Sequence, residues 1–292
     1  MRRKTVITES MSKRSLFRFP ERSSILVLAI WIMVFFSILA TGVYRIIAAQ
    51  VSIVRAVEER VICPNLAQAV CYYARLENDS DQTAYDSLGE LLAERQLVLG
   101  HGKAVYTQID EESRLNLNTC SEDSLARLPE MNINLAKKVM ASDLFPFELI
   151  EELLLVEGIT PEIYAEIKDF ITVFSNNKVN INTASAEVLI AVGMDEGLTG
   201  LIVEYRAGPD GKDGTEDDRV FETVPEVIDE LRAYGSLSGA QEALLLSLES
   251  QGLLTVESKN FDLKINTQIL GKNALKYDII LDKDWIKQWR EF

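Results

Sequence analysis

The sequence predicts an α+β fold in which an N-terminal transmembrane helix leads into an α/β domain with a large inserted α-helical domain. Residues 25–43 contain no charged side chain, which indicates a helix that crosses a membrane. Alternating apolar and polar residues, typical of strands, appear at 97–110 and again at 261–281. Between these segments the pattern is mostly helical, so we expect a helical block to interrupt a sheet.

The N-terminal apolar run predicts a retained membrane anchor. Its 19 residues, Ile25–Val43, are just sufficient to cross a hydrocarbon core of about 30 Å. The first 24 residues carry a charge of +5 and the rest of the chain −20, so the positive-inside rule places the leader in the cytoplasm and the body outside. A cleaved secretory signal is the alternative, but its apolar stretch is about 7 to 15 residues long. Here the apolar pattern continues past Arg45 to Val57, as one long helix would.

The body is predicted to start with helix and to continue into a hairpin. Residues 58–96 place apolar side chains on one helical face. Residues 97–110 alternate and contain Gly100 and Gly102, which predicts a hairpin with the single histidine, His101, in its turn.

Strand character returns near the C-terminus. Residues 261–269 alternate with a period of two, and residues 271–273 can turn the chain into a partner strand at 277–281. The order of strand, helical block and strand indicates a helical insertion within a sheet domain.

Two segments of the helical block repeat one phrase. Leu115-Asn116-Leu117-Asn118-Thr119 is followed by Ser121 and Leu125, and Val179-Asn180-Ile181-Asn182-Thr183 is followed by Ser185 and Leu189. Each copy predicts a short extended piece, an Asn/Thr turn whose side chains cap backbone donors, and an amphipathic helix. The repeat is therefore a supersecondary unit used twice.

A Gly/Asp-rich loop in the second copy predicts a calcium site. Residues 208–218 place five carboxylates within nine residues, among three glycines that let the backbone carbonyls turn inward. A flexible oxygen-rich loop suits calcium better than magnesium, and the spacing does not fit an EF-hand. A solvated acidic turn is the alternative. The candidate ligands are the carboxylates of Asp210, Asp213, Asp217 and Asp218 and the carbonyl of Thr215, with Glu216 facing water.

The cysteines and the acidic pairs do not predict a catalytic site. Cys63 and Cys71 would lie about 12 Å apart on an unbroken helix, too far for a disulfide, although Pro64 could break that helix. Buried, apolar cysteines are the simpler interpretation, and it extends to Cys120. A single histidine and the absence of nucleophile or phosphate-loop motifs argue against an enzyme.

Three phrases together carry a resemblance to a known family. They are Arg22-Ser23-Ser24-Ile25-Leu26, the junction Asp110-Glu111-Glu112-Ser113-Arg114-Leu115-Asn116-Leu117-Asn118, and Asn180-Ile181-Asn182-Thr183-Ala184-Ser185 before the acidic loop. In this order, and with the closing segment 285–290, they resemble the minor pseudopilin K family of type II secretion systems, also called general secretion pathway protein K. The resemblance covers nearly the whole chain.

The resemblance implies a pilin-like α/β domain with an inserted helical domain that binds calcium. It implies an inner-membrane protein, with a cytoplasmic N-terminus and a periplasmic body, that caps the tip of the pseudopilus. Such a subunit joins minor pseudopilins I and J and the other pseudopilins, and it helps to initiate assembly for protein export across the outer membrane. No nucleic acid partner is expected.

The family resemblance also implies processing by a prepilin peptidase. The family's leader usually ends in glycine, and Ser23 stands at the aligned position, so we expect cleavage between Ser23 and Ser24. The fifth mature residue would then be Leu28, where major pseudopilins carry glutamate. This absence fits a subunit with no neighbour above it, because a carboxylate in lipid is costly without a partner amine.

These observations divide the chain into five predicted parts. They are a leader at 1–23, a membrane and N-terminal pilin helix at 24–57, the first part of the α/β domain at 58–114, the helical insertion with both repeats and the calcium loop at 115–250, and the C-terminal strands at 251–292.

A membrane-anchored DNA receptor of the competence type is the alternative function. Asn-x-Asn-Thr-x-Ser-x-x-x-Leu also opens helix-hairpin-helix units, in which a Gly-x-Gly hairpin lets backbone N–H groups reach a phosphate. The first copy here has Leu128-Pro129-Glu130-Met131-Asn132 and the second Gly193-Met194-Asp195, each with a carboxylate at the contact point. The phosphate-binding function is therefore expected to be lost while the packing frame remains.

Overall fold

The computed structural model describes residues 21–215, 217–282 and 285–292. The chain forms two compact units with the boundary after Glu58. The long helix α1, Glu21–Ser80, belongs to both units, and each unit is described here by itself.

The first unit is the N-terminal part of α1. From Ile25 to Glu58 every residue is exposed, and the apolar stretch is long enough to cross a membrane once. The predicted continuation of the helix past Arg45 is confirmed. Ser23 and Ser24 lie in the first turn of α1, whereas the leader before Glu21 lies outside the described residues.

The second unit contains an antiparallel sheet with the strand order β1-β2-β7-β8-β9. Strands β2 and β7 are hydrogen-bonded neighbours, with Asp110 opposite Phe261, although the whole helical block separates them in sequence. This order confirms the predicted α+β fold with a helical insertion. The strands are β1, Arg95–Leu99; β2, Gly102–Asp110; β7, Asn260–Ile269; β8, Lys272–Asp282; and β9, Ile286–Glu291.

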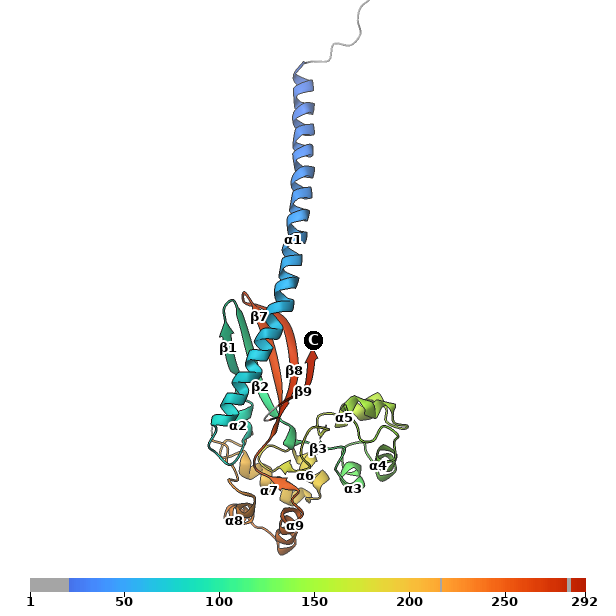
Figure 1. The fold of residues 1–292 in the computed structure, drawn as a ribbon, viewed down its shortest axis with the longest axis vertical. Helices are drawn as coiled ribbons and strands as arrows, with labels where there is room; N and C mark the ends of the chain where they lie inside the picture. Colours follow the sequence, from blue (N-terminus) through green and yellow to red (C-terminus); the bar gives the residue numbers. More distant parts are fainter. Residues whose placement is uncertain (1–20, 216, 283–284) are drawn as a thin grey trace, which may run out of the picture. The chain divides into compact units, whose positions relative to one another are not determined.

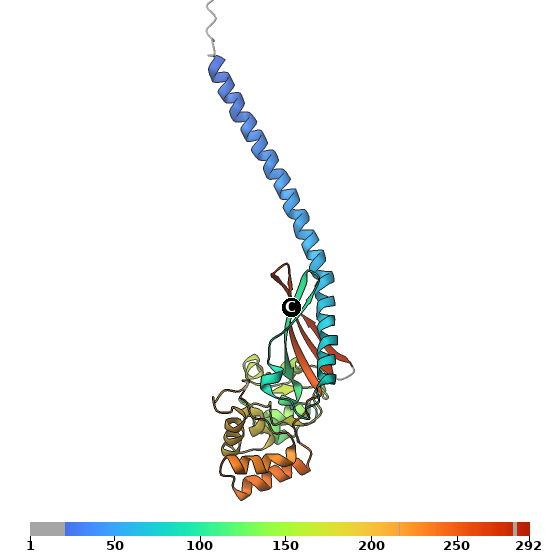
Figure 2. The ribbon, with the colours of Figure 1, turned by 90° about the vertical axis from the view of Figure 1, so that its left-hand side faces the viewer.

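The part of α1 beyond Glu58 packs on one face of this sheet, and Figures 1 and 2 show the helix and the sheet as two layers. Gly102 lies where the two layers approach closely, because a Cβ there would be only 2.5 Å from Leu66 Cδ1. Pro64 does not end the helix, and all three cysteines are free. Cys63 and Cys71 are buried as predicted, whereas Cys120 is only half-buried. The buried residues of this layer include Cys63, Leu66, Val70, Ala74, Tyr106, Leu263, Ile265 and Ile279.

The insertion gathers at the end of the sheet where β2 ends and β7 begins (Figure 1). It is preceded by the short helix α2, Leu88–Leu91, and it opens with the 3-10 turn η1, Glu111–Ser113. Its first copy contains β3, Leu115–Asn116; α3, Glu122–Ala126; α4, Ile133–Met140; η2, Ile150–Leu155; α5, Pro161–Ile167; and β4, Ile171–Thr172. Its second copy contains β5, Val179–Asn180; α6, Ala186–Val192; α7, Glu196–Arg206; η3, Val224–Glu226; α8, Val227–Tyr234; α9, Gly239–Ser250; and β6, Leu254–Thr255.

Two elements differ from the sequence expectation. The sequence predicts a mostly helical block here, but residues 150–155 form a 3-10 helix rather than an α-helix, and residues 171–172 form a strand. That strand pairs in parallel with β3, a long-range contact that overrides local helical propensity.

Candidate functional site

The two copies of the repeat share one hydrogen-bond framework. In each, the first asparagine accepts a bond from the backbone N–H two residues on, over 2.8 Å for Asn116 and 3.0 Å for Asn180. The second asparagine clamps a distant phenylalanine, donating to its carbonyl and accepting from its N–H. Asn118 clamps Phe147 over 2.8 and 2.7 Å, and Asn182 clamps Phe221 over 3.0 and 2.9 Å.

Each copy is closed by a short parallel strand pair. Strand β3 pairs with β4, and β5 pairs with β6. Ser121 caps α3 and Ser185 caps α6, because each hydroxyl accepts a bond from the N–H three residues on. The predicted supersecondary unit, used twice, is therefore confirmed.

The hairpin of the first copy is closed to phosphate by its own side chains. Glu130 takes the left-handed conformation, with φ of 57°, at a position where a glycine would be unstrained. The Asn132 carboxamide accepts bonds from the N–H groups of Asn134 and Leu135 at the start of α4, over 3.0 and 3.1 Å. These are the donors that a phosphate at a helix N-terminus would use.

The hairpin of the second copy is closed in the same way. Gly193 keeps a positive φ of 122°, but Asp195 caps α7 by accepting the Leu198 N–H over 2.8 Å. Gln241 of α9 also donates to this carboxylate, over 3.1 Å. A negative charge therefore occupies the position that nucleic acid would need, and a phosphate there would be repelled.

A buried polar joint connects the insertion to the sheet. Asp110, at the end of β2, accepts bonds from Glu112 N–H (2.6 Å), Asn180 Nδ2 (3.0 Å) and the Thr183 hydroxyl (2.5 Å). Asn180 Nδ2 also donates to Ser258 Oγ just before β7. Burial raises the pKa of Asp110, against the effect of these donors. The second Asn/Thr turn is thus fixed to both strands between which the insertion enters and leaves.

The two glutamates after Asp110 complete the joint. Glu112 accepts bonds from Lys259 N–H, Asn260 N–H and Asn260 Nδ2, and burial raises its pKa to about 7. Glu111 pairs with Arg114 over 2.6 Å and accepts a bond from the Thr172 hydroxyl. Donors from within the chain bind the carboxylates of Asp110, Glu111 and Glu112. This cluster therefore holds the insertion and the sheet together.

The acidic loop between α7 and Phe221 is organised by its own backbone donors. Asp217 accepts bonds from Asp210 N–H and from the Thr215 hydroxyl, over 3.0 and 2.8 Å. Asp218 accepts from Gly214 N–H over 2.7 Å, and Asp210 from Lys212 N–H over 2.8 Å. The Thr215 carbonyl accepts a bond from the Asp218 N–H over 3.3 Å. Glu216 lies outside the described residues.

Asp213 is paired with a buried arginine that the sequence pattern did not indicate. Arg206, only 3% exposed at the end of α7, donates through Nη1 to the carbonyls of Ile181 and Ala184, over 2.9 and 2.7 Å. Its Nη2 lies 3.4 Å from Asp213 Oδ2. The loop is therefore tied to the second Asn/Thr turn, and through that turn to the joint.

The oxygen ligands of the loop suit calcium, but the carboxylates do not point toward a common position where an ion could bind. Carboxylate and carbonyl oxygens are the hard ligands that calcium takes. Within the described part of the chain, however, no three His, Cys, Asp or Glu side chains are grouped so as to hold a metal ion. An ion bound by Asp210, Asp213, Asp217, Asp218 and the Thr215 carbonyl would have to replace the present hydrogen bonds.

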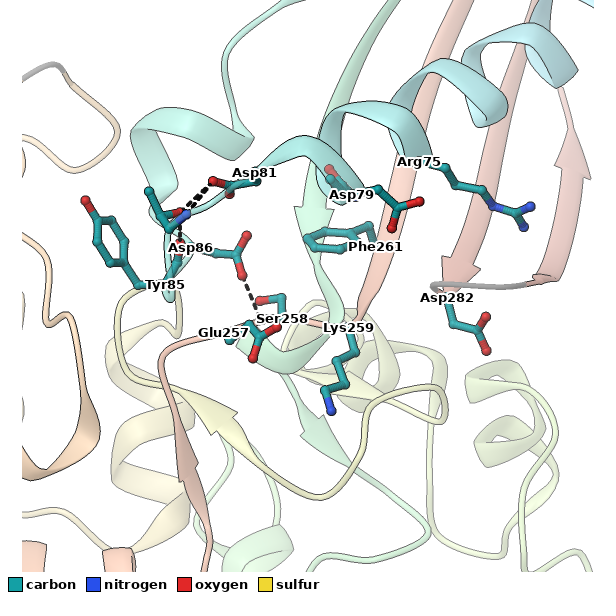
Figure 3. Close-up of a pocket in the computed structure, with 12 residues that line it drawn as sticks. Arg75, Asp79, Asp81, Tyr85, Asp86, Glu257, Ser258, Lys259, Phe261 and Asp282 are labelled. Carbon is teal, nitrogen blue, oxygen red and sulfur yellow. Dashed lines mark hydrogen bonds between the residues drawn. The ribbon is translucent and has the colours of Figure 1, made fainter.

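A cavity of about 240 Å³ opens beside the joint, between the end of α1, the loop that follows it and the segment before β7 (Figure 3). Phe261 lines its apolar part, and the buried residues Asp86 and Ser258 line its polar part. Asp86 Oδ2 accepts the Ser258 N–H over 2.6 Å. Burial, together with the neighbouring carboxylates Asp110, Glu90 and Asp81, raises the pKa of Asp86 to about 7.

The sequence indicated the residues of the joint and of the acidic loop, but it did not indicate Arg206 or Asp86. Neither residue belongs to a motif that the sequence shows. The signal for both is their burial, which arises only when distant segments pack together.

Comparisons with known proteins find a sequence motif and distant structural likenesses. The helix-hairpin-helix motif matches residues 110–172, which contain the first copy of the repeat. One chain of the crystal structure of the GspK-GspI-GspJ complex from the enterotoxigenic Escherichia coli type 2 secretion system is similar at 17% sequence identity, with a TM-score of 0.47. That alignment covers 78% of this chain and 95% of the other. No curated protein matches the sequence.

Proposed function

We propose that this protein is a minor pseudopilin that caps the tip of a type II secretion pseudopilus, helps to initiate its assembly for protein export, and joins minor pseudopilins I and J. The observation that supports the proposal most strongly is the difference between the two parts of α1. Its first part exposes apolar side chains throughout, and its last part packs by one face on an antiparallel sheet. A helix of this kind anchors a subunit in the inner membrane and offers a continuous apolar surface to the helices of other subunits.

The insertion supports a structural role rather than nucleic acid binding. The packing framework of two helix-hairpin-helix units is intact, whereas Asn132 and Asp195 close both sets of phosphate-binding donors. The strongly acidic body also repels phosphate. A block of this size next to the sheet would end a filament by covering the place of the next subunit.

Co-purification tests this proposal. The full-length chain, in detergent and with an affinity tag, is co-expressed with candidate minor pseudopilins I and J. We expect a stable complex with them and prepilin peptidase cleavage between Ser23 and Ser24. Recovery of the chain alone from all such co-expressions would contradict the proposal.

A membrane-tethered DNA receptor is the second candidate, because the matched motif is common in such proteins. Fluorescence anisotropy with labelled duplex DNA and the full-length chain distinguishes the two at about 0.15 M salt. The pseudopilin proposal predicts no binding, whereas saturable, salt-dependent binding would favour the receptor.

We further propose that the acidic loop binds calcium after its carboxylates turn inward. Calorimetry of the full-length chain with calcium chloride measures this directly. The matched variants are the double change Asp217→Asn and Asp218→Asn in the loop, and Asp143→Asn at an exposed site elsewhere. We expect heat from the wild type and from Asp143→Asn but not from the double variant. Absence of heat from the wild type would show that the loop is only a solvated acidic turn.

A further inference from the structure

The cavity beside the joint contains a buried carboxylate with no cationic partner. Asp86 is 9% exposed, and its position is fixed by two bonds, from its N–H to the Val256 carbonyl (2.8 Å) and from the Ser258 N–H to its Oδ2. Among the described residues, no donor reaches its other oxygen, Oδ1. The charges that act on Asp86 belong to carboxylates and all disfavour its ionised form. A cation placed close to such a carboxylate favours its ionised form.

The two cations of the cavity do not serve this carboxylate. Arg75 and Lys259 line the cavity, but Figure 3 shows both side chains extending away from Asp86. Arg75 Nε is buried without a hydrogen-bond partner. The space in front of Asp86 is therefore open to a cation from outside the chain.

The remaining lining fits an elongated cationic side chain. Asp79, Asp81 and Glu257 are exposed carboxylates around the cavity, and the buried ring of Phe261 offers an apolar surface. An arginine or lysine side chain has the matching parts, an apolar stem and a charged head. The volume of about 240 Å³ lies below the roughly 300–1,000 Å³ of small-molecule sites. The size therefore favours a single side chain over a metabolite.

We propose that this cavity receives an arginine or lysine side chain from a neighbouring subunit of the assembly, whose cationic head pairs with the carboxylate of Asp86. The proposal rests on the proposed function for the identity of the neighbour, but not for the chemistry of the cavity. The joint lies directly behind the cavity, because Ser258 contacts both Asp86 and Asn180. A neighbour docked here would contact the chain just before β7, where the insertion ends and the chain returns to the sheet.

Binding of capped amino acids tests the chemistry. The full-length chain in detergent is titrated with N-acetyl-arginine amide, N-acetyl-lysine amide and the neutral analogue N-acetyl-citrulline amide, with binding followed by NMR. We expect the two cationic compounds to bind, and citrulline amide to bind at least roughly tenfold more weakly, as for the loss of a hydrogen bond to a charged group. Binding should also weaken as the pH falls below about 7, because Asp86 then becomes protonated.

Variants locate the site. Asp86→Asn keeps an oxygen for the Ser258 N–H but removes the charge, and it should weaken binding of arginine amide roughly tenfold or more. Asp143→Asn, an exposed control outside the cavity, should bind within about twofold of the wild type. Circular dichroism confirms that both variants are folded.

Three outcomes would overturn the proposal. Equal binding of citrulline amide, or by the Asp86→Asn variant, would show that charge pairing at Asp86 is not involved. Displacement of arginine amide by equimolar calcium chloride or magnesium chloride would reassign the cavity to a metal ion. Tighter binding of free arginine than of the capped compound would reassign it to a metabolite.

Co-purification with the minor pseudopilins separates this proposal from the proposed function. If the wild type captures them and Asp86→Asn captures less, both hold. If the wild type captures none while arginine amide still binds at Asp86, the proposed function fails but the chemistry of the cavity stands. If Asp86→Asn captures them as well as the wild type does, the docking proposal fails alone.

Discussion

Among single residues, the asparagines that clamp a distant phenylalanine are important for the stability of the insertion. Asn182 is 3% exposed and satisfies both backbone groups of Phe221, itself fully buried. Unsatisfied backbone groups in such a place are costly, since water cannot replace the lost partner. The Asn182 side chain therefore fixes Phe221 in the core of the second copy, at the point where the acidic loop ends.

Replacement of Asn182 tests this dependence. We expect Asn182→Ala to lower the free energy of unfolding by about 2–4 kcal/mol, because two buried backbone groups lose their partners. Asn118→Ala removes the equivalent clamp at a half-buried position and should cost less. Asn134→Ala, at an exposed position on α4, should change it by about 0.5 kcal/mol at most. Urea unfolding of the full-length chain in detergent measures all three, and equal costs would contradict the interpretation.

Asp86 also has a consequence for stability. Its pKa is about 7 in the fold against an ordinary value of 3.8, so the folded chain binds this proton more tightly than the unfolded chain does. The free energy of unfolding should therefore fall as the pH rises from about 4 to about 7 and then level off. Glu112, whose pKa is also about 7, adds to the same trend. In Asp86→Asn the slope should be smaller, and stability at pH 8 should be higher than in the wild type.

Urea midpoints at several pH values between 5 and 8 measure this effect. The charged groups that act on Asp86 are Asp81, Glu90 and Asp110, and none of them is changed in the variant. Identical pH slopes in the wild type and in Asp86→Asn would show that this carboxylate is not protonated in the fold.

At the scale of elements, the acidic loop has one position where glycine is required by close contact. Gly208 has a φ of +60°, and a Cβ there would lie 2.2 Å from the Asp217 carbonyl oxygen. Gly211 has a φ of +69° but no atom within 4 Å of its Cβ position. The two glycines share the backbone strain of a substitution and differ only in the clash.

The pair therefore gives a matched test of how the loop closes. Gly211→Ala should cost about 1 kcal/mol from backbone strain. Gly208→Ala should cost at least about 1 kcal/mol more, because Asp217 must move and its bond to the Asp210 N–H is lost. Hydrogen exchange should rise across residues 208–221 in Gly208→Ala but not in Gly211→Ala. Similar exchange in both variants would mean that the contact with Asp217 does not hold the loop.

Elements built from local patterns were predictable from the sequence. The apolar run, the hairpin around His101 and both Asn/Thr turns depend on neighbouring residues, and each appears where it was expected. Strand β9 lies in the part predicted to hold the C-terminal strands, but its bounds were not predicted, because it is an edge strand with mostly exposed residues and a weak alternation. The burial of Arg206 and Asp86 could not be predicted either, since it depends on segments far apart in sequence.

At the scale of the whole molecule, the chain combines an exposed apolar helix with a body that is consolidated at one joint. The joint fastens the insertion to both β2 and β7, so the insertion is held at its entry and at its exit. Because the insertion is attached at both ends, it can contact a neighbouring subunit without separating the strands of the sheet. This arrangement is the physical basis for the proposed cap.

The position of the protein in isolated filaments shows whether it caps them. Pseudopili are prepared from cells that express the full-length chain with an epitope tag after Phe292, and the tag is located with gold-labelled antibody in the electron microscope. We expect label at one end of each filament and shorter or fewer filaments when the gene is deleted. Label distributed along the filaments, or none on them, would show that the protein does not cap the tip.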